Sequence, residues 1–161
     1  MPDTKRIQAM MNFWETEYRA HPTNFQAAFD LTGAYLQLGQ TNKAEQVLDQ
    51  VVADPRTDAS ALAFAARFLD QMSDLPRMEI ALKKLTDQDT HSPEAWFDLA
   101  TSQAMQGETN QALASLRRSA EENTGRLARL PGATNIFLNL RTNPHFRSLK
   151  DMPEFQKLAP R

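Results

Sequence analysis

The sequence contains no cysteine among its 161 residues. Disulfide bonds, thiolate metal sites and cysteine nucleophiles are therefore excluded, while the redox compartment stays open. Glycine is scarce as well, with five residues in all. None of these glycines forms the Gly-x-Gly-x-x-Gly or Gly-x-x-x-x-Gly-Lys pattern of a phosphate-binding loop. We therefore expect the chain to bind no cofactor.

Long apolar runs and an excess of positive charge are also missing. No stretch approaches the ~18 apolar residues that span a bilayer, so we expect no direct membrane insertion by this segment. The opening residues, MPDTKRIQAMMNFWETEYR, carry too many charges for a signal peptide. The 18 Lys+Arg against 20 Asp+Glu leave a net charge of −2 without a basic stripe, so we expect no nucleic-acid partner. The segment is expected to be soluble as given, and its cellular compartment and the status of Met1 as the natural start stay open.

Candidate catalytic and metal-binding groups are few and isolated. His21, His91 and His145 are the only histidines, and none has a second ligand at the close spacing of a metal site. Glu121 and Glu122 are neighbours on an expected helix and so point to different sides, which does not suit an acid–base pair. We therefore expect no metal site, no catalytic residue and no enzymatic activity.

What the sequence does contain is a repeat of 34 residues. Three segments align without gaps when they begin at Phe25, Ala59 and Pro93. The shared apolar positions are Ala28, Leu62 and Trp96, followed by Leu31, Ala65 and Leu99 and then by Thr32, Ala66 and Ala100. Steps of three and four residues place these positions on one face of a helix. Each segment therefore opens with a predicted amphipathic helix.

A helix break and a second helix follow in every segment. The break falls at Gly39, Ser73 and Gly107, small residues suited to the left-handed conformation that ends a helix. The second helix shares Ala44, Met78 and Ala112, then Leu48, Leu82 and Leu116. Small residues at the first of these positions let antiparallel helices approach closely. Asp58 and Ser92 are the predicted N-caps of the next two first helices.

This pattern resembles the tetratricopeptide repeat, with units at residues 25–58, 59–92 and 93–126. The resemblance rests on Tyr35, Gly39, Ala44, Leu48 and Pro55 in the first unit and on Trp96, Leu99, Ala100, Gly107 and Ala112 in the third. It departs from the family at Ser73, Met78 and Ser119, and at Gln103, where an aromatic residue is usual. The resemblance implies an all-α fold, a right-handed α–α superhelix of antiparallel helix pairs with helical caps at both ends. We expect one domain over residues 1–161.

Both ends are expected to cover the apolar faces that a stack of repeats leaves open. Residues 4–21 are a predicted N-terminal helix, in the phase of the second helix of a preceding repeat. Its apolar residues at helical spacing are Ile7, Met10, Met11, Trp14 and Tyr18. Residues 127–161 are the predicted C-terminal cap, in which NPHFRSL and MPEFQKL share a Pro-x-Phe-x-x-Leu unit. A third short helix is predicted over residues 136–140.

The resemblance also implies a partner-binding concave face, lined by the fifth, ninth, twelfth and thirteenth positions of each segment. These positions hold Phe29, Gly33, Leu36 and Gln37, then Ala63, Arg67, Asp70 and Gln71, then Phe97, Thr101, Ala104 and Met105. We predict that a protein or peptide segment with apolar anchors binds there, centred on Phe29, Arg67 and Phe97. Only Arg67 could grip a terminal carboxylate as some members of the family do, so that mode is not expected.

Two alternatives stay open at this point. In the first alternative, the positions of the predicted concave face contact the N-terminal helix or the C-terminal tail of the same chain. In the second alternative the chain is a structural or oligomerising accessory domain of a larger bacterial enzyme, membrane-anchored or cytoplasmic. For the binding module itself, the expected partner is a separate protein or peptide, or another part of its own longer polypeptide.

Overall fold

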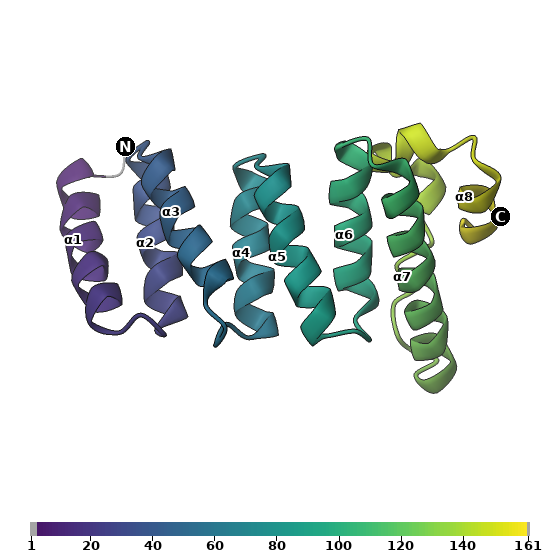
Figure 1. Cartoon of the computed structure of the whole chain (residues 1–161), viewed down its shortest axis with the longest axis horizontal. Helices are drawn as coiled ribbons and strands as arrows, with labels where there is room; N and C mark the ends of the chain where they lie inside the picture. Colours follow the sequence, from purple (N-terminus) through teal and green to yellow (C-terminus); the bar gives the residue numbers. More distant parts are fainter. Residues whose placement is uncertain (1–2, 161) are drawn as a thin grey trace. The chain divides into compact units, whose positions relative to one another are not determined.

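The computed structural model describes residues 3–160, and within that range every regular element is helical (Figure 1). The long helices are α1 (Thr4–Ala20), α2 (Phe25–Gln37), α3 (Thr41–Ala53), α4 (Ala59–Gln71), α5 (Leu75–Gln88), α6 (Pro93–Met105) and α7 (Thr109–Arg129). The C-terminal tail adds two 3₁₀ helices, η1 (Leu140–Thr142) and η2 (Pro144–Leu149), and the short helix α8 (Pro153–Leu158). The predicted all-α architecture of helix pairs is confirmed.

The helices group into two compact units, Met1–Met72 and Ser73–Arg161. The first unit holds α1 to α4, in which α1 packs on α2, α2 on α3, and α4 on both α2 and α3. The second unit holds α5 to α8, with α6 packed between α5 and α7. The expectation of one domain over residues 1–161 stays a prediction.

The helix starts agree with the register read from the sequence. Helices α2, α4 and α6 begin at Phe25, Ala59 and Pro93, the first residues of the three repeats. The Asp58 carboxylate accepts a hydrogen bond from the Ala61 amide at 2.8 Å. The equivalent bond joins the Ser92 hydroxyl to the Ala95 amide at 3.1 Å. These caps satisfy N–H groups that the first turn of a helix leaves unpaired, and both predicted caps are confirmed.

The residues at the three predicted helix breaks adopt the left-handed conformation. Gly39 has a φ of 70°, Ser73 of 57° and Gly107 of 79°. A Cβ added at Gly39 or Gly107 would meet nothing within 4 Å, so a side chain is disfavoured there by the backbone alone. Ser73 carries that backbone cost in the second repeat.

We therefore expect Ser73→Gly to stabilise the protein and Gly107→Ser to destabilise it, each by about 1 kcal/mol. The two substitutions exchange the same residue types at equivalent positions of two repeats. Urea denaturation followed by circular dichroism measures both effects. A shift of both variants in the same direction would show that the backbone conformation does not control stability at these turns.

The apolar positions predicted from the repeat form the cores of the two units. Ala28, Ala44 and Leu48 are fully buried in the first unit, as are Ala100 and Leu116 in the second. Each buried leucine side chain contributes about 1.5–3 kcal/mol relative to exposure. The small residues allow the two helices of a repeat to lie close together, as the sequence predicted.

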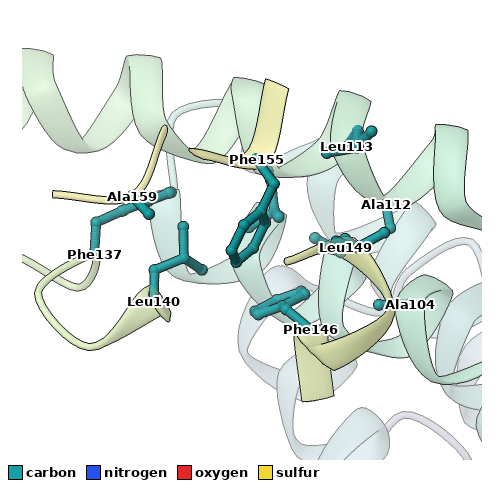
Figure 2. Packing of buried hydrophobic residues seen from close by; sticks show 11 residues of the cluster. Ala104, Ala112, Leu113, Phe137, Leu140, Phe146, Leu149, Phe155 and Ala159 are labelled. Atoms are coloured by element: carbon teal, nitrogen blue, oxygen red, sulfur yellow. The ribbon is translucent and has the colours of Figure 1, made fainter. Parts of the chain in front are cut away.

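The C-terminal tail packs over α6 and α7 and closes the second unit. Figure 2 shows the Phe146 and Phe155 rings next to each other in this cluster, and their centroids are 6.1 Å apart. Phe146 and Leu149 are fully buried, and Phe155 is 2% exposed. They pack in one cluster with Ala112 and with other residues of α6 and α7. The second Pro-x-Phe-x-x-Leu unit thus forms α8, whereas the first forms η2.

Several details of the sequence interpretation are wrong. Residues 136–140 form turns that lead into η1, not a helix of their own. Helix α7 extends to Arg129, beyond the repeat unit that ends at residue 126, which is not in conflict with the repeat bounds. Trp96 is only half-buried, and its indole N–H donates to the Thr90 carbonyl at 2.9 Å.

Candidate functional site

Aromatic side chains gather on one face of α2 and α4 in the first unit. The Phe29 ring lies 5.6 Å from the Phe64 ring and 5.9 Å from the Phe68 ring, centroid to centroid. Phe29 and Phe68 are stacked, with 17° between their planes. Such offset aromatic pairs stabilise a fold by about 0.5–1.5 kcal/mol beyond the free energy gained from the area they bury. The cluster therefore holds a large aromatic surface in a fixed arrangement.

Part of this surface is open to a partner. Phe64 is 47% exposed, whereas Phe29 beneath it is 7% exposed. The Arg67 guanidinium lies over the Phe64 ring, 5.5 Å from its centroid, in a cation–π contact. Arg67 is exposed and makes no ion pair within residues 3–160. We call the surface formed by Phe29, Phe64, Arg67 and Phe68 the aromatic face.

The other residues predicted for this site in the first unit differ in their exposure. Gly33 and Leu36 on α2 and Ala63 on α4 are half-buried. Gln37, Asp70 and Gln71 are exposed. Their contacts within the chain do not show whether they bind a partner, so their role in binding stays a prediction.

Sequence reasoning missed Phe64 and Phe68. They stand one place after the fifth and ninth positions of the second repeat, which hold Ala63 and Arg67. Their spacing of four residues places both rings on one side of α4. That side lies next to the core stripe of Leu62 and Ala65. The feature of the sequence that could have identified these residues is a pair of phenylalanines outside the core stripe.

In the second unit, the predicted site residue Phe97 contacts the tail. Its ring meets Phe137 at 5.7 Å and Phe146 at 5.3 Å, both edge-on. The sequence left open whether the predicted site positions contact the chain's own tail. At Phe97 they do. Thr101 donates its hydroxyl hydrogen to the Phe97 carbonyl at 2.9 Å, and Met105 is 46% exposed.

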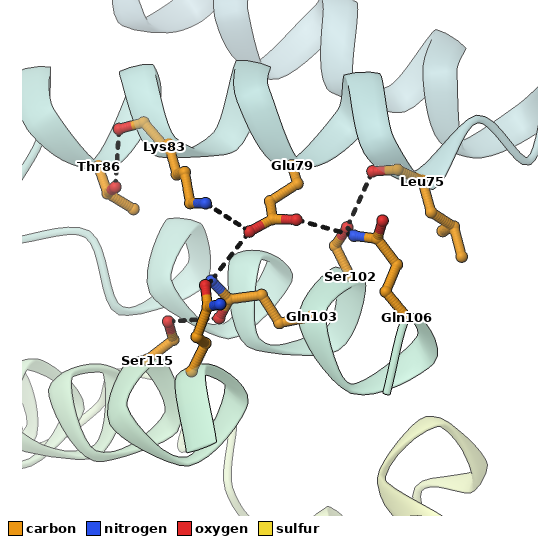
Figure 3. Close-up of polar contacts among 9 residues, drawn as sticks. Leu75, Glu79, Lys83, Thr86, Ser102, Gln103, Gln106 and Ser115 are labelled. Atoms are coloured by element: carbon orange, nitrogen blue, oxygen red, sulfur yellow. Dashed lines mark hydrogen bonds and ion pairs between the residues drawn. The ribbon is translucent and has the colours of Figure 1, made fainter. Parts of the chain in front are cut away.

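A polar network lies on the other side of α6 in the second unit (Figure 3). The Glu79 carboxylate pairs with the Lys83 ammonium at 2.6 Å. It also accepts hydrogen bonds from the Gln103 amide at 3.3 Å and from the Gln106 amide at 2.9 Å. The Ser115 hydroxyl donates to the Gln103 carbonyl oxygen at 2.7 Å. These contacts join α5, α6 and α7.

The network explains the unusual residue at position 103, where the family has an aromatic side chain. Gln103 is 3% exposed, and its amide is satisfied by the surrounding side chains. Burial raises the pKa of the Glu79 carboxyl, but hydrogen bonds from Lys83 and two glutamine amides outweigh it and leave that pKa below its ordinary value. Glu79 is therefore a paired, ionised structural group at neutral pH.

Metal and membrane sites find no support in the described part of the chain. Between residues 3 and 160, no group of three or more His, Asp or Glu side chains is arranged to hold a metal ion. Of the histidines, His91 lies 3.0 Å from the Glu122 carboxylate on the surface. No described helix has the length and apolar character that crossing a membrane requires.

Comparisons with known proteins agree with this architecture. Residues 16–68 match a family model described as tetratricopeptide repeat. Among solved structures, the chain is similar to the crystal structure of MamA, with 18% identity and a TM-score of 0.58. The similarity covers 92% of this chain and 81% of that chain, and at this identity it shows the fold alone. No curated protein matches the sequence.

Proposed function

We propose that this chain, which is a tetratricopeptide-repeat protein, is an interaction scaffold that binds a protein partner through its aromatic face. The single observation that carries the proposal is Phe64, which is 47% exposed on top of a stacked aromatic pair. The proposed function is binding without a chemical step, and the proposed site lies on α2 and α4, the first helices of two successive repeats.

Physical chemistry supports this face as a binding surface. Aromatic and arginine side chains dominate measured binding energies, because they bury a large area and lose little conformational freedom. Phe64 and Arg67 are held against each other before any partner arrives. Less ordering is therefore required on association. The exposed Gln37 and Gln71 supply polar groups on the same two helices.

The same groups define the chemistry of the partner segment. An apolar side chain of the partner packs against Phe64 and Leu36, and a carboxylate pairs with the Arg67 guanidinium. A helical or extended segment presents both groups at suitable spacing. The surface on two helices is small, so we expect affinity in the micromolar range.

Site-specific photo-crosslinking tests the location. The photoreactive amino acid benzoylphenylalanine replaces Phe64 in one protein and Leu138, an exposed residue of the second unit, in the control. We expect a partner protein to be crosslinked from position 64 and not from position 138. Equal crosslinking from both positions, or from the control position alone, would contradict the proposed site.

A further inference from the structure

A separate pocket of about 500 Å³ opens between α1, α2 and α3 in the first unit. Leu31, Tyr35 and Val47 line it and are at most 7% exposed, so the floor is closed and largely apolar. Leu31 and Tyr35 point away from Phe29 on α2, because a helix turn of 3.6 residues places them about 160° and about 120° around the axis from it. The pocket is therefore distinct from the aromatic face.

Two cations stand at the edge of this pocket without a carboxylate partner. Arg19 on α1 and Lys43 on α3 both line it, and both are exposed. The Lys43 ammonium lies 5.3 Å from the centre of the Tyr35 ring. Over the described part of the chain, neither side chain makes an ion pair, whereas Arg56 lies 2.7 Å from Asp54. The pocket thus presents two cations, one from α1 and one from α3.

The one carboxylate that lines the pocket is already engaged. Glu15 accepts a hydrogen bond from the Tyr35 hydroxyl. Burial, this hydrogen bond and the charge of Glu15 raise the pKa of the Tyr35 phenol above its ordinary value, against the opposing charge of Arg19. The phenol therefore stays protonated and keeps donating to Glu15. This hydrogen bond does not remove the charge of the carboxylate, but two cations stand against one carboxylate in the lining, so the pocket is cationic on balance.

The equivalent pocket of the second unit lacks this arrangement. Two repeats further along the chain, Lys83 takes the place of Glu15, Asp87 that of Arg19, and Gln111 that of Lys43. Lys83 is held by Glu79 at 2.6 Å, so that pocket offers an anion and no unpaired cation. The cationic edge is therefore a property of the first unit alone and not of the repeat fold.

We propose that the pocket between α1, α2 and α3 binds an acidic peptide segment that carries an apolar side chain beside its carboxylate. The apolar side chain packs on Leu31 and Val47, where it is removed from water. The carboxylate lies between Arg19 and Lys43 and accepts charge-assisted hydrogen bonds from them. Charge complementarity makes an acidic segment the occupant, and it distinguishes this site from the equivalent pocket of the second unit.

The experiment selects short random peptides displayed on phage against the intact chain, with removal of those that also bind an Arg19→Gln/Lys43→Gln protein. We expect the surviving peptides to carry aspartate or glutamate next to an apolar residue. Arg19→Gln and Lys43→Gln should each weaken their binding by about three- to fivefold, the effect of one partly exposed ion pair. Raising the salt concentration should also weaken the binding of these peptides to the unsubstituted chain, because salt screens the ion pairs.

Gln50 provides a test in both directions, because it lines the pocket from an exposed position. Gln50→Lys is expected to strengthen binding and Gln50→Glu to weaken it, each by about twofold or more. Arg117→Gln, which removes an exposed cation from α7, serves as the charge control and should leave binding unchanged. Opposite responses to the two Gln50 variants cannot arise from a general loss of stability.

Three results would overturn the proposal. In the first, the selection yields no acidic peptides. In the second, the selected peptides bind equally to the Arg19, Lys43 and Gln50 variants. In the third, Phe64→Ala weakens their binding as strongly as Lys43→Gln, which would assign the peptides to the aromatic face. The proposed function does not depend on these results, since its own test uses position 64.

Discussion

Removal of residues 143–161 is expected to lower the melting temperature sharply or to cause aggregation. The deletion takes away Phe146, Leu149 and Phe155, which are almost completely buried. Their loss exposes the apolar sides of α6 and α7, including Ala104 and Leu113. An uncovered end of a helical repeat presents a contiguous apolar patch, which favours self-association. Differential scanning calorimetry and analytical ultracentrifugation measure the two outcomes.

A truncated protein that is monomeric and as stable as the full chain would contradict the capping role of the tail. A shorter deletion supplies the control. Removal of Pro160 and the residue after it leaves all three apolar anchors in place and takes away only an exposed hydrogen bond from Arg141 to the Pro160 carbonyl, so the melting temperature is expected to change little.

The largest effect of a single substitution is expected at Phe146, which is fully buried and contacts the rings of Phe97 and Phe155. Phe146→Ala should cost about 3–5 kcal/mol of unfolding free energy, because it leaves a cavity in a packed aromatic cluster. Urea denaturation with tryptophan fluorescence measures the loss. Leu138→Ala is the matched control in the same tail, since Leu138 is 66% exposed and should change stability by less than about 0.5 kcal/mol.

A loss at Phe146 as small as that at Leu138 would mean that the tail does not hold the second unit together. The comparison is informative because both residues lie in the irregular segment after α7, where the sequence offers no repeat register. A large loss at Phe146 alone identifies the ring contacts, and not the tail backbone, as the source of stability.

The sequence predicted the helix pairs well because their signals are local and periodic. The starts at Phe25, Ala59 and Pro93 follow from an apolar stripe that repeats every 34 residues. Even the second repeat was placed correctly, although Ser73 replaces glycine at its break. The flanking repeats fixed that register, and the positive φ of 57° at Ser73 agrees with it.

The details of the tail were predicted less well, because they depend on contacts between distant segments. The contact of Phe97 with Phe137 and Phe146 joins residues far apart in sequence, and no local pattern predicts it. Trp96 stands at a core position of the repeat, yet it is only half-buried, and its indole N–H donates to the Thr90 carbonyl. At the proposed site, the sequence did not single out Phe64, because its packing on the Phe29 ring joins two helices that lie far apart in sequence.

The proposed scaffold function is tested most directly by calorimetric titration of the crosslinked partner segment into the wild-type chain and two variants. We predict that Phe64→Ala and Arg67→Ala each weaken binding by about 1–3 kcal/mol, because each removes a central group of the aromatic face. Ile80→Ala removes an apolar side chain that is 56% exposed on α5, and it should change the binding free energy by less than about 0.5 kcal/mol. Undiminished binding by both the Phe64 and the Arg67 variant would contradict the proposed function of this face.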